Sequence, residues 1–336
     1  MKISDIQRYD SEKMHETYEK WPEIAQENYF ARDLQKIQFK NIDHIVFAGV
    51  GGSGTIGDVI SSILSKNQIH VNVVKGYLLP KTVDHNTLVI TTSVSGNSKE
   101  ALTILQNSKK SNAKFLAFSS GGTMKKYAVK NKICHYEIPE IHSPRASFPC
   151  YLYSILNVLG DIIPVKKQYV RESISLLMKT RKEISSTNMT NSNRALSLAK
   201  WISGFPVIYY PWGLHSAAIR FKNSLQENAK THVFVEDVIE TSHNGIVAWE
   251  KSSKVQPILL RGTDDNIKTK ERWEIFKEYF KKNGIECKEI VSVKGNIISK
   301  IVNLIYLLDY TSIYRAIIMK NDPTPVNSID FIKSRL

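Results

Sequence analysis

The sequence predicts an α/β protein built from two domains, each a doubly wound parallel sheet between two layers of helices. From residue 44 onward, short apolar runs alternate with segments whose apolar residues recur at helical intervals. The second half of the chain repeats this alternation after a long stretch without strand signals. Regular alternation of this kind is typical of βαβ units, in which helices cover both faces of a parallel sheet.

The first sheet is predicted by the apolar runs of the first half of the chain. Residues 1–40, which are rich in Glu, Lys, Tyr and Trp, are expected to form helices that lead into this domain. Helices are also expected from Ser53 and from Asn97, because each follows a strand and a glycine or serine turn. Strands are expected at 44–48, 70–74, 87–91, 114–118 and 133–138.

The middle of the chain is predicted to be helical. Apolar residues recur at helical intervals over 150–200, and the polar stretch 185–193 is its most loop-like part. The second half is expected to contain strands at 206–210, 231–235, 256–260 and 286–291 and helices at 214–228, 268–282 and 297–319. We therefore expect an N-terminal domain with leading helices at 1–160, a helical linker at 161–195 and a C-terminal domain at 196–336.

The composition is that of an ordinary globular protein, with 42% hydrophobic and 23% charged residues. No run approaches about 18 uninterrupted apolar residues, and the start lacks the apolar core of a signal peptide. We therefore expect a cytoplasmic protein without a membrane partner. Cys134, Cys150 and Cys287 have no paired spacing, so neither a disulfide framework nor a zinc site is indicated.

The formal net charge of +14 would attract anions of any kind, including phosphorylated metabolites and nucleic acid. A nucleic-acid-binding protein is expected to interleave basic and aromatic residues on one face or to contain a recognisable binding module. The sequence shows neither feature, so nucleic acid is not an expected partner.

A glycine-rich loop follows the first predicted strand. Gly49, Gly51 and Gly54 satisfy the G-x-G-x-x-G pattern of dinucleotide sites. Such a site also needs an acidic residue at the end of the next strand to bind the ribose hydroxyls, but that strand ends in Lys75. NAD is therefore not expected. Because no Gly-Lys-Ser/Thr closes the loop, a Walker-type triphosphate site is excluded as well.

Two interpretations of this glycine-rich loop remain open. In one, Gly51, Gly52 and Ser53 present backbone N–H groups and a hydroxyl to an anion at the positive end of a helix. In the other, the glycines only make a tight turn between a strand and a helix.

A second loop, rich in serine, favours the anion. It also follows a strand and opens a helix, and the hydroxyls of Ser93, Ser95 and Ser98 could converge on one phosphate. A plain N-cap by Ser95 or Asn97, closed into a capping box by Glu100, is the structural alternative. The two roles are compatible.

Together the two loops resemble the sugar isomerase (SIS) domain, in which they hold the phosphate of a phosphosugar. Further motifs resemble, in the right order, the bifunctional phosphoglucose/phosphomannose isomerases: Pro144-Arg145 with Pro149, Gln226-Glu227-Asn228-Ala229-Lys230, His243-Asn244 with Trp249-Glu250, and Asp330-Phe331-Ile332-Lys333. The resemblance runs from about residue 45 to the C-terminus. It implies two SIS domains of flavodoxin-like or Rossmann-like type, a phosphosugar substrate and a homodimer.

Isomerisation of an aldose to a ketose needs a carboxylate base, a group that stabilises an oxyanion and a ring-opening acid, but no metal or organic cofactor. The resemblance implies Glu227 as the base and Arg145 as the group facing the enediolate. It implies that His243 and Lys333 open the ring, with His243 reaching the site from the partner subunit. Three of the residues 329–332 are apolar, which indicates that the tail carrying Lys333 is docked.

The predicted function is interconversion of glucose 6-phosphate and mannose 6-phosphate with fructose 6-phosphate through a cis-enediolate. The alternative is a non-catalytic SIS-domain protein that binds a phosphosugar and regulates a partner. Glu227, His243 and Arg145 occur together in the sequence, which argues against this alternative. A sensor needs the serine loops but not the base.

Overall fold

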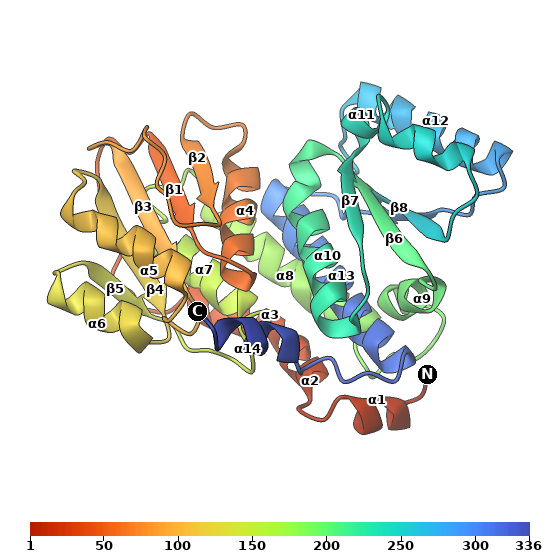
Figure 1. Ribbon diagram of the computed structural model, residues 1–336, viewed down its shortest axis with the longest axis horizontal. Coiled ribbons are helices and arrows are strands. Elements are labelled where there is room, and N and C mark those ends of the chain that lie inside the picture. The colour runs from red at the N-terminus through yellow and green to blue at the C-terminus, as the bar shows by residue number, and fades with distance from the viewer. The chain divides into compact units, whose positions relative to one another are not determined.

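The computed structural model describes all residues from 1 to 336 (Figure 1). Contacts between residues divide the chain into two compact units, each with its own parallel sheet. One unit contains Lys20–Val170 and Lys333–Leu336, and the other contains Met1–Glu19 and Arg171–Ile332. The predicted fold class, two parallel-sheet α/β domains, is therefore confirmed.

The unit of the first sheet has five parallel strands in the doubly wound order β2-β1-β3-β4-β5. These strands are β1 (His44–Ala48), β2 (His70–Val74), β3 (Thr87–Thr92), β4 (Lys114–Ser119) and β5 (Cys134–Glu137). The helices are α3 (Trp21–Tyr29), α4 (Gly52–Leu64), α5 (Lys99–Gln106), α6 (Gly122–Lys130) and α7 (Phe148–Val158). Every residue of β1 and β3 is buried, which explains why these strands are nearly continuous apolar runs rather than alternating patterns.

The unit of the second sheet repeats this order with four parallel strands, β7-β6-β8-β9. These strands are β6 (Phe205–Tyr210), β7 (Phe234–Asp237), β8 (Val255–Arg261) and β9 (Lys288–Val291). The helices after β6 are α10 (His215–Ala229), α11 (Val238–Thr241), α12 (Ile267–Lys282), α13 (Ile297–Ile318) and α14 (Asn327–Lys333). The prediction placed β7 three residues too early, because the chain leaves α10 through a left-handed Lys230 and uses 231–233 to reach the sheet.

The strandless middle of the chain is helical, as predicted, with α7 followed by α8 (Lys167–Ile184) and α9 (Arg194–Trp201). The first two helices, α1 (Ile3–Tyr9) and α2 (Met14–Glu19), contact α13 and belong to the unit of the second sheet. They do not lead into the first sheet, because the apolar surface of α13 gives them a partner far along the sequence. The domain boundaries expected from the sequence remain a prediction.

Helix α13 is the longest helix of the chain, with 22 residues, and it is strongly apolar. By length and composition it could cross a membrane, but 89% of its most apolar window is buried in the protein. A single helix of this kind is typical of the core of a globular protein as much as of a membrane span. Its burial explains its composition without a membrane.

A buried ion pair joins α10 to α13. Arg220 and Asp309 are 2% and 0% exposed, and a guanidinium nitrogen lies 2.7 Å from the carboxylate oxygen Oδ2. The hydroxyl of Ser224 donates to Asp309 Oδ1 at 2.5 Å. Burial alone would lower the pKa of Arg220, but the attraction of Asp309 outweighs it and raises that pKa above its ordinary value.

Replacing Asp309 with Ala is expected to lower the free energy of unfolding by about 3–5 kcal/mol, because it removes the carboxylate that pairs with the buried charge of Arg220. Urea denaturation followed by circular dichroism measures this loss. The double variant Arg220→Met/Asp309→Leu is expected to recover most of it, since no charge is then left buried. A loss below about 1 kcal/mol in the single variant would contradict this account.

Candidate active site

The glycine-rich loop connects β1 to α4 in the unit of the first sheet. Gly51 has a φ of 58°, which favours glycine, and it precedes the first residue of α4. A Cβ on Gly52 would lie 3.0 Å from the carbonyl oxygen of Pro144 and 3.4 Å from the Cα of Arg145. The absence of a side chain at position 52 therefore lets the loop pack directly against the Pro144-Arg145 segment. Arg145, 93 residues later in sequence, is thus placed beside the start of α4.

The segment that carries Arg145 is held by its own hydrogen bonds. The hydroxyl of Ser147 donates to the carbonyl oxygen of Ser143 at 2.9 Å and accepts from the backbone N–H of Ile141 at 2.8 Å. Arg145 is only 5% exposed. Its guanidinium is therefore held in an environment poor in water, where its charge acts more strongly on a neighbouring group than it would in solvent.

The serine loop follows β3, the strand next to β1. Its Ser93 is fully buried, and the hydroxyls of Ser93 and Ser98 lie 2.9 Å apart. The hydroxyl of Ser93 also accepts the backbone N–H of Ser98 at 3.3 Å, and Ser95 is exposed. Gly96 has a φ of 70°, which closes the turn between these serines.

The capping box considered for this loop does not form. Ser98 is the N-cap of α5, and no side chain caps the helix. Asn97 instead accepts from the backbone N–H and the hydroxyl of Thr123, at 3.0 and 2.9 Å, while Glu100 accepts the hydroxyl of Tyr77 at 3.2 Å. The N-terminal amides of α5 therefore lack a side-chain acceptor, as an anion-binding helix start requires.

Lys75 at the end of β2 occupies the position where a dinucleotide site needs an acidic residue. Its ammonium lies 2.7 Å from the carboxylate of Asp58 on α4, and that carboxylate is buried. A cation paired in this way cannot accept the hydrogen bonds of a ribose diol. The end of β2 therefore offers no acidic side chain to the ribose of a dinucleotide.

The two loops of the first unit leave adjacent strands on the same edge of the sheet. Ala48 at the end of β1 pairs with Thr91 near the end of β3, and a Cβ on Gly49 would lie 2.9 Å from the carbonyl oxygen of Thr92. Ligands of doubly wound sheets bind at this carboxyl edge, where the strand order reverses. The edge therefore brings together backbone amides, hydroxyls and the Arg145 segment.

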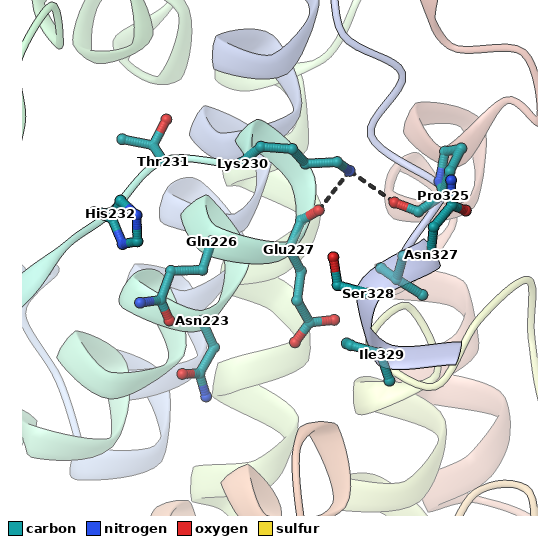
Figure 2. A pocket seen from close by; sticks show the side chains of 11 residues that line it. Asn223, Gln226, Glu227, Lys230, Thr231, His232, Pro325, Asn327, Ser328 and Ile329 are labelled. Atoms are coloured by element: carbon teal, nitrogen blue, oxygen red, sulfur yellow. Dashed lines mark hydrogen bonds between the residues drawn. The ribbon is translucent and has the colours of Figure 1, made fainter. Parts of the chain in front are cut away.

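Glu227 lies in the other unit, on the wall of a pocket of about 650 Å³. Figure 2 shows α10 residues on one side of it and the C-terminal segment on the other. The lining residues are Asn223, Gln226, Glu227, Lys230, Thr231, His232, Pro325, Val326, Asn327, Ser328 and Ile329. Glu227 is half-buried, and its side chain reaches into this pocket.

His243 and Lys333 are exposed in the single chain. His243 follows α11, where its backbone N–H donates to the carbonyl oxygen of Glu240 at 2.9 Å, and it does not line the Glu227 pocket. Lys333 ends α14, a helix without a buried residue, and Phe331 and Ile332 are each 59% exposed. Of the three apolar residues expected to dock the tail, Ile329 is partly buried and lines the Glu227 pocket, whereas Phe331 and Ile332 stay mostly exposed in the single chain.

No group of three or more His, Cys, Asp or Glu side chains is arranged to hold a metal ion. The candidate groups are hydroxyls, backbone amides, Arg145 and Lys333 in the unit of the first sheet, and Glu227 and His243 in the other unit.

Two family models match the chain. The SIS domain matches residues 38–148, and the bacterial phospho-glucose isomerase C-terminal SIS domain matches residues 191–336. The bifunctional phosphoglucose/phosphomannose isomerase of Caldicellulosiruptor bescii is 32% identical to this chain. The alignment covers 96% of this chain and 98% of that protein. The chain belongs to the bifunctional phosphoglucose/phosphomannose isomerase family.

Another member of the isomerase family, from Aquifex aeolicus, is 30% identical over 87% of this chain and 90% of its own length. Among solved structures, the C-terminal domain of glucosamine-fructose-6-phosphate aminotransferase from Francisella tularensis superposes with a TM-score of 0.69. The match covers 93% of this chain and 98% of that chain, at 14% identity. At this identity the likeness shows the shared fold alone. The family resemblance inferred from the loops and motifs is confirmed.

Within this isomerase-family chain, sequence reasoning missed part of the Glu227 pocket. Asn223 shares the helix face of Glu227, and this spacing of four residues was a usable signal. His232 lies two residues after the Glu-Asn-Ala-Lys motif. The wall formed by residues 325–329 had no local signal, because its contact with α10 joins segments about 95 residues apart.

If Ser95 binds the phosphate, replacing it with Ala is expected to raise the KM for fructose 6-phosphate about tenfold and to change kcat little, because the hydrogen bond would be lost in both ground and transition states. Steady-state kinetics measure the split. The matched control is Ser252→Ala, which removes an exposed hydroxyl of the other unit. Unchanged KM in Ser95→Ala would remove this serine from the phosphate site.

Proposed function

We propose that the protein interconverts glucose 6-phosphate and mannose 6-phosphate with fructose 6-phosphate. The observation that carries the proposal is Glu227, a half-buried carboxylate on the wall of a 650 Å³ pocket, large enough for a hexose phosphate. Both relatives described above bear the name of this bifunctional isomerase. The two loops at the edge of the first sheet supply the donors that a phosphate needs.

In this mechanism the phosphate binds through the amides and hydroxyls of Gly51, Gly52 and Ser53 and through Ser93, Ser95 and Ser98. His243 and Lys333 move the protons that open the ring. Glu227 then removes the proton from C2 of the open-chain aldose and returns it to C1. The C2 hydroxyl loses a proton and the C1 carbonyl oxygen gains one, so that C1 becomes the alcohol and C2 the carbonyl of the ketose. The intermediate is a cis-enediolate, and the charge that develops on its oxygens is stabilised by the buried cation Arg145.

One enediolate serves both aldoses, since glucose 6-phosphate and mannose 6-phosphate differ only in configuration at C2. Returning the proton from either face of C2 gives one or the other aldose. Activity on the second sugar therefore needs tolerance for a reoriented hydroxyl, but no further catalytic group.

We also propose that the active form is a homodimer in which His243 serves the partner's site. In its own chain His243 is exposed and does not line the Glu227 pocket. The neighbouring side chains of Ile239 and Val247 are 39% and 58% exposed, and Phe234 is 54% exposed. Exposed apolar residues in the stretch of chain that carries His243 support contact with a second copy.

The cytoplasm is the proposed location. Cys134, Cys150 and Cys287 are all free thiols, which suits a reducing compartment. Neither nucleic acid nor a membrane is a proposed partner, and no metal or organic cofactor is assigned to the reaction.

The deciding test is an assay of the purified protein with fructose 6-phosphate in the presence of a metal chelator, paired with calorimetric titration of the same sugar phosphate. Formation of glucose 6-phosphate and mannose 6-phosphate would support the isomerase. Binding without turnover would instead favour a phosphosugar-binding regulator.

A further inference from the structure

The side chain of Lys230 joins the end of α10 to the C-terminal segment of the same unit (Figure 2). Its ammonium donates to the carbonyl oxygens of Glu227 at 2.7 Å and Pro325 at 2.8 Å. Longer contacts reach the carbonyl oxygens of Asn228 at 3.4 Å and Asp322 at 3.3 Å. An ammonium has three N–H donors, so the two short bonds engage two of them and the longer contacts share the third.

The carbonyl oxygens around this ammonium suit a cation. Those of Glu227 and Asn228 belong to the last turn of α10, where the helix dipole is negative. Those of Asp322 and Pro325 belong to a segment 92 and 95 residues further along the chain. One charge therefore stabilises the end of a helix and attaches a distant segment to it.

The contacts are a property of the side chain and do not follow from the backbone alone. Lys230 has a φ of 55° at the end of α10, and Lys320 has a φ of 60° just after α13. No hydrogen bond or ion pair of the Lys320 ammonium is present, and this lysine is exposed. Lys320 is therefore a matched control for Lys230: it has a similar positive φ, but its side chain attaches no other segment.

The segment that Lys230 holds forms half of the Glu227 pocket, because residues 325–329 line it. Beyond this pocket wall, α14 has no buried residue. Asp322 also anchors the segment, because its carboxylate accepts the hydroxyl of Ser11 at 2.5 Å and the backbone N–H of Thr324 at 2.9 Å. The bond from the Lys230 ammonium to Pro325 is a charged attachment of the segment to α10.

We propose that Lys230 is a positioning residue that clamps residues 322–329 to α10 and thereby fixes the shape of the pocket around Glu227. It acts through main-chain oxygens of the pocket wall. The attachment of residues 322–329 by Lys230 does not depend on the proposed function. Only the expected effect of this attachment on catalysis rests on the proposed function.

The clamp is tested first without any assay of activity. Hydrogen exchange measured by mass spectrometry is expected to be about tenfold faster over residues 322–333 in Lys230→Met and in Lys230→Gly, because a charge-assisted hydrogen bond no longer opposes local opening. Lys230→Gly separates the side chain from the backbone, since glycine adopts a positive φ without steric cost. Lys230→Arg is expected to restore part of the protection. Lys320→Met and Lys320→Gly are the matched controls and should leave exchange unchanged.

Kinetics then test the consequence for the site. Lys230→Met is expected to raise the KM for fructose 6-phosphate about tenfold more than it lowers kcat, since a loosened wall weakens binding before it alters proton transfer. Unchanged exchange with a large loss of kcat would overturn the clamp and place Lys230 on the substrate. Unchanged exchange with unchanged kinetics would overturn it as well. If the wild type lacks isomerase activity but Lys230→Met still exchanges faster, the clamp stands and the proposed function fails.

Discussion

Replacing Glu227 with Gln is expected to lower kcat for the isomerisation of fructose 6-phosphate by about a thousandfold, with little change in KM. The amide keeps the size and hydrogen-bonding capacity of the side chain but cannot accept the proton that moves between C1 and C2. Glu227 lines a pocket with other polar groups that can still bind the sugar, which is why binding should persist. Steady-state kinetics and calorimetric titration of the variant with fructose 6-phosphate separate these two effects.

The matched control for this substitution is Glu278→Gln, which changes an exposed glutamate on helix α12. It should leave both kcat and KM unchanged. Thermal melting of both variants checks that neither loss comes from unfolding. Full activity in Glu227→Gln would show that another group is the base.

Mixing two inactive variants is expected to restore activity to about a quarter of the wild-type value if His243 acts across a dimer interface. In a dimer of Glu227→Gln with His243→Ala, one site combines both lesions and the other site combines two intact residues. Random mixing makes about half of the dimers mixed, and each mixed dimer has one working site of two. Co-refolding of the two purified variants followed by the fructose 6-phosphate assay measures the recovery.

Each variant refolded alone provides the background of this experiment. A further control co-refolds the double variant Glu227→Gln/His243→Ala with His243→Ala, a mixture in which every His243 is missing and no intact site can form. Recovery only in the first mixture supports His243 in the partner's site. If that mixture stays inactive although size-exclusion chromatography shows dimers, His243 acts within its own chain or has no role.

Much of the candidate site could be predicted from the sequence because its proposed phosphate-binding part is local. The two loops each lie within a few residues of a strand end. Several glycines and serines close together at such a position are typical of an anion site at a helix start. The bond between Ser93 and Ser98 and the left-handed Gly96 confirm that the serines form one turn. The Glu227 motif was recognised, but the pocket wall of residues 325–329 was not, since no local pattern links it to α10.

The sequence by itself determined the family, the helices between the strands and the strands of both sheets, with β7 displaced by three residues. Buried parallel strands must be apolar over their whole length, and their ends are marked by glycine, serine or proline, so both features can be found within a short window. Only the tertiary structure decided that Gly52 packs on the Pro144-Arg145 segment, that α1 and α2 join α13, and that Lys230 clamps the tail. These contacts join segments far apart in sequence, and their free energy depends on shape and burial that exist only once the chain is folded.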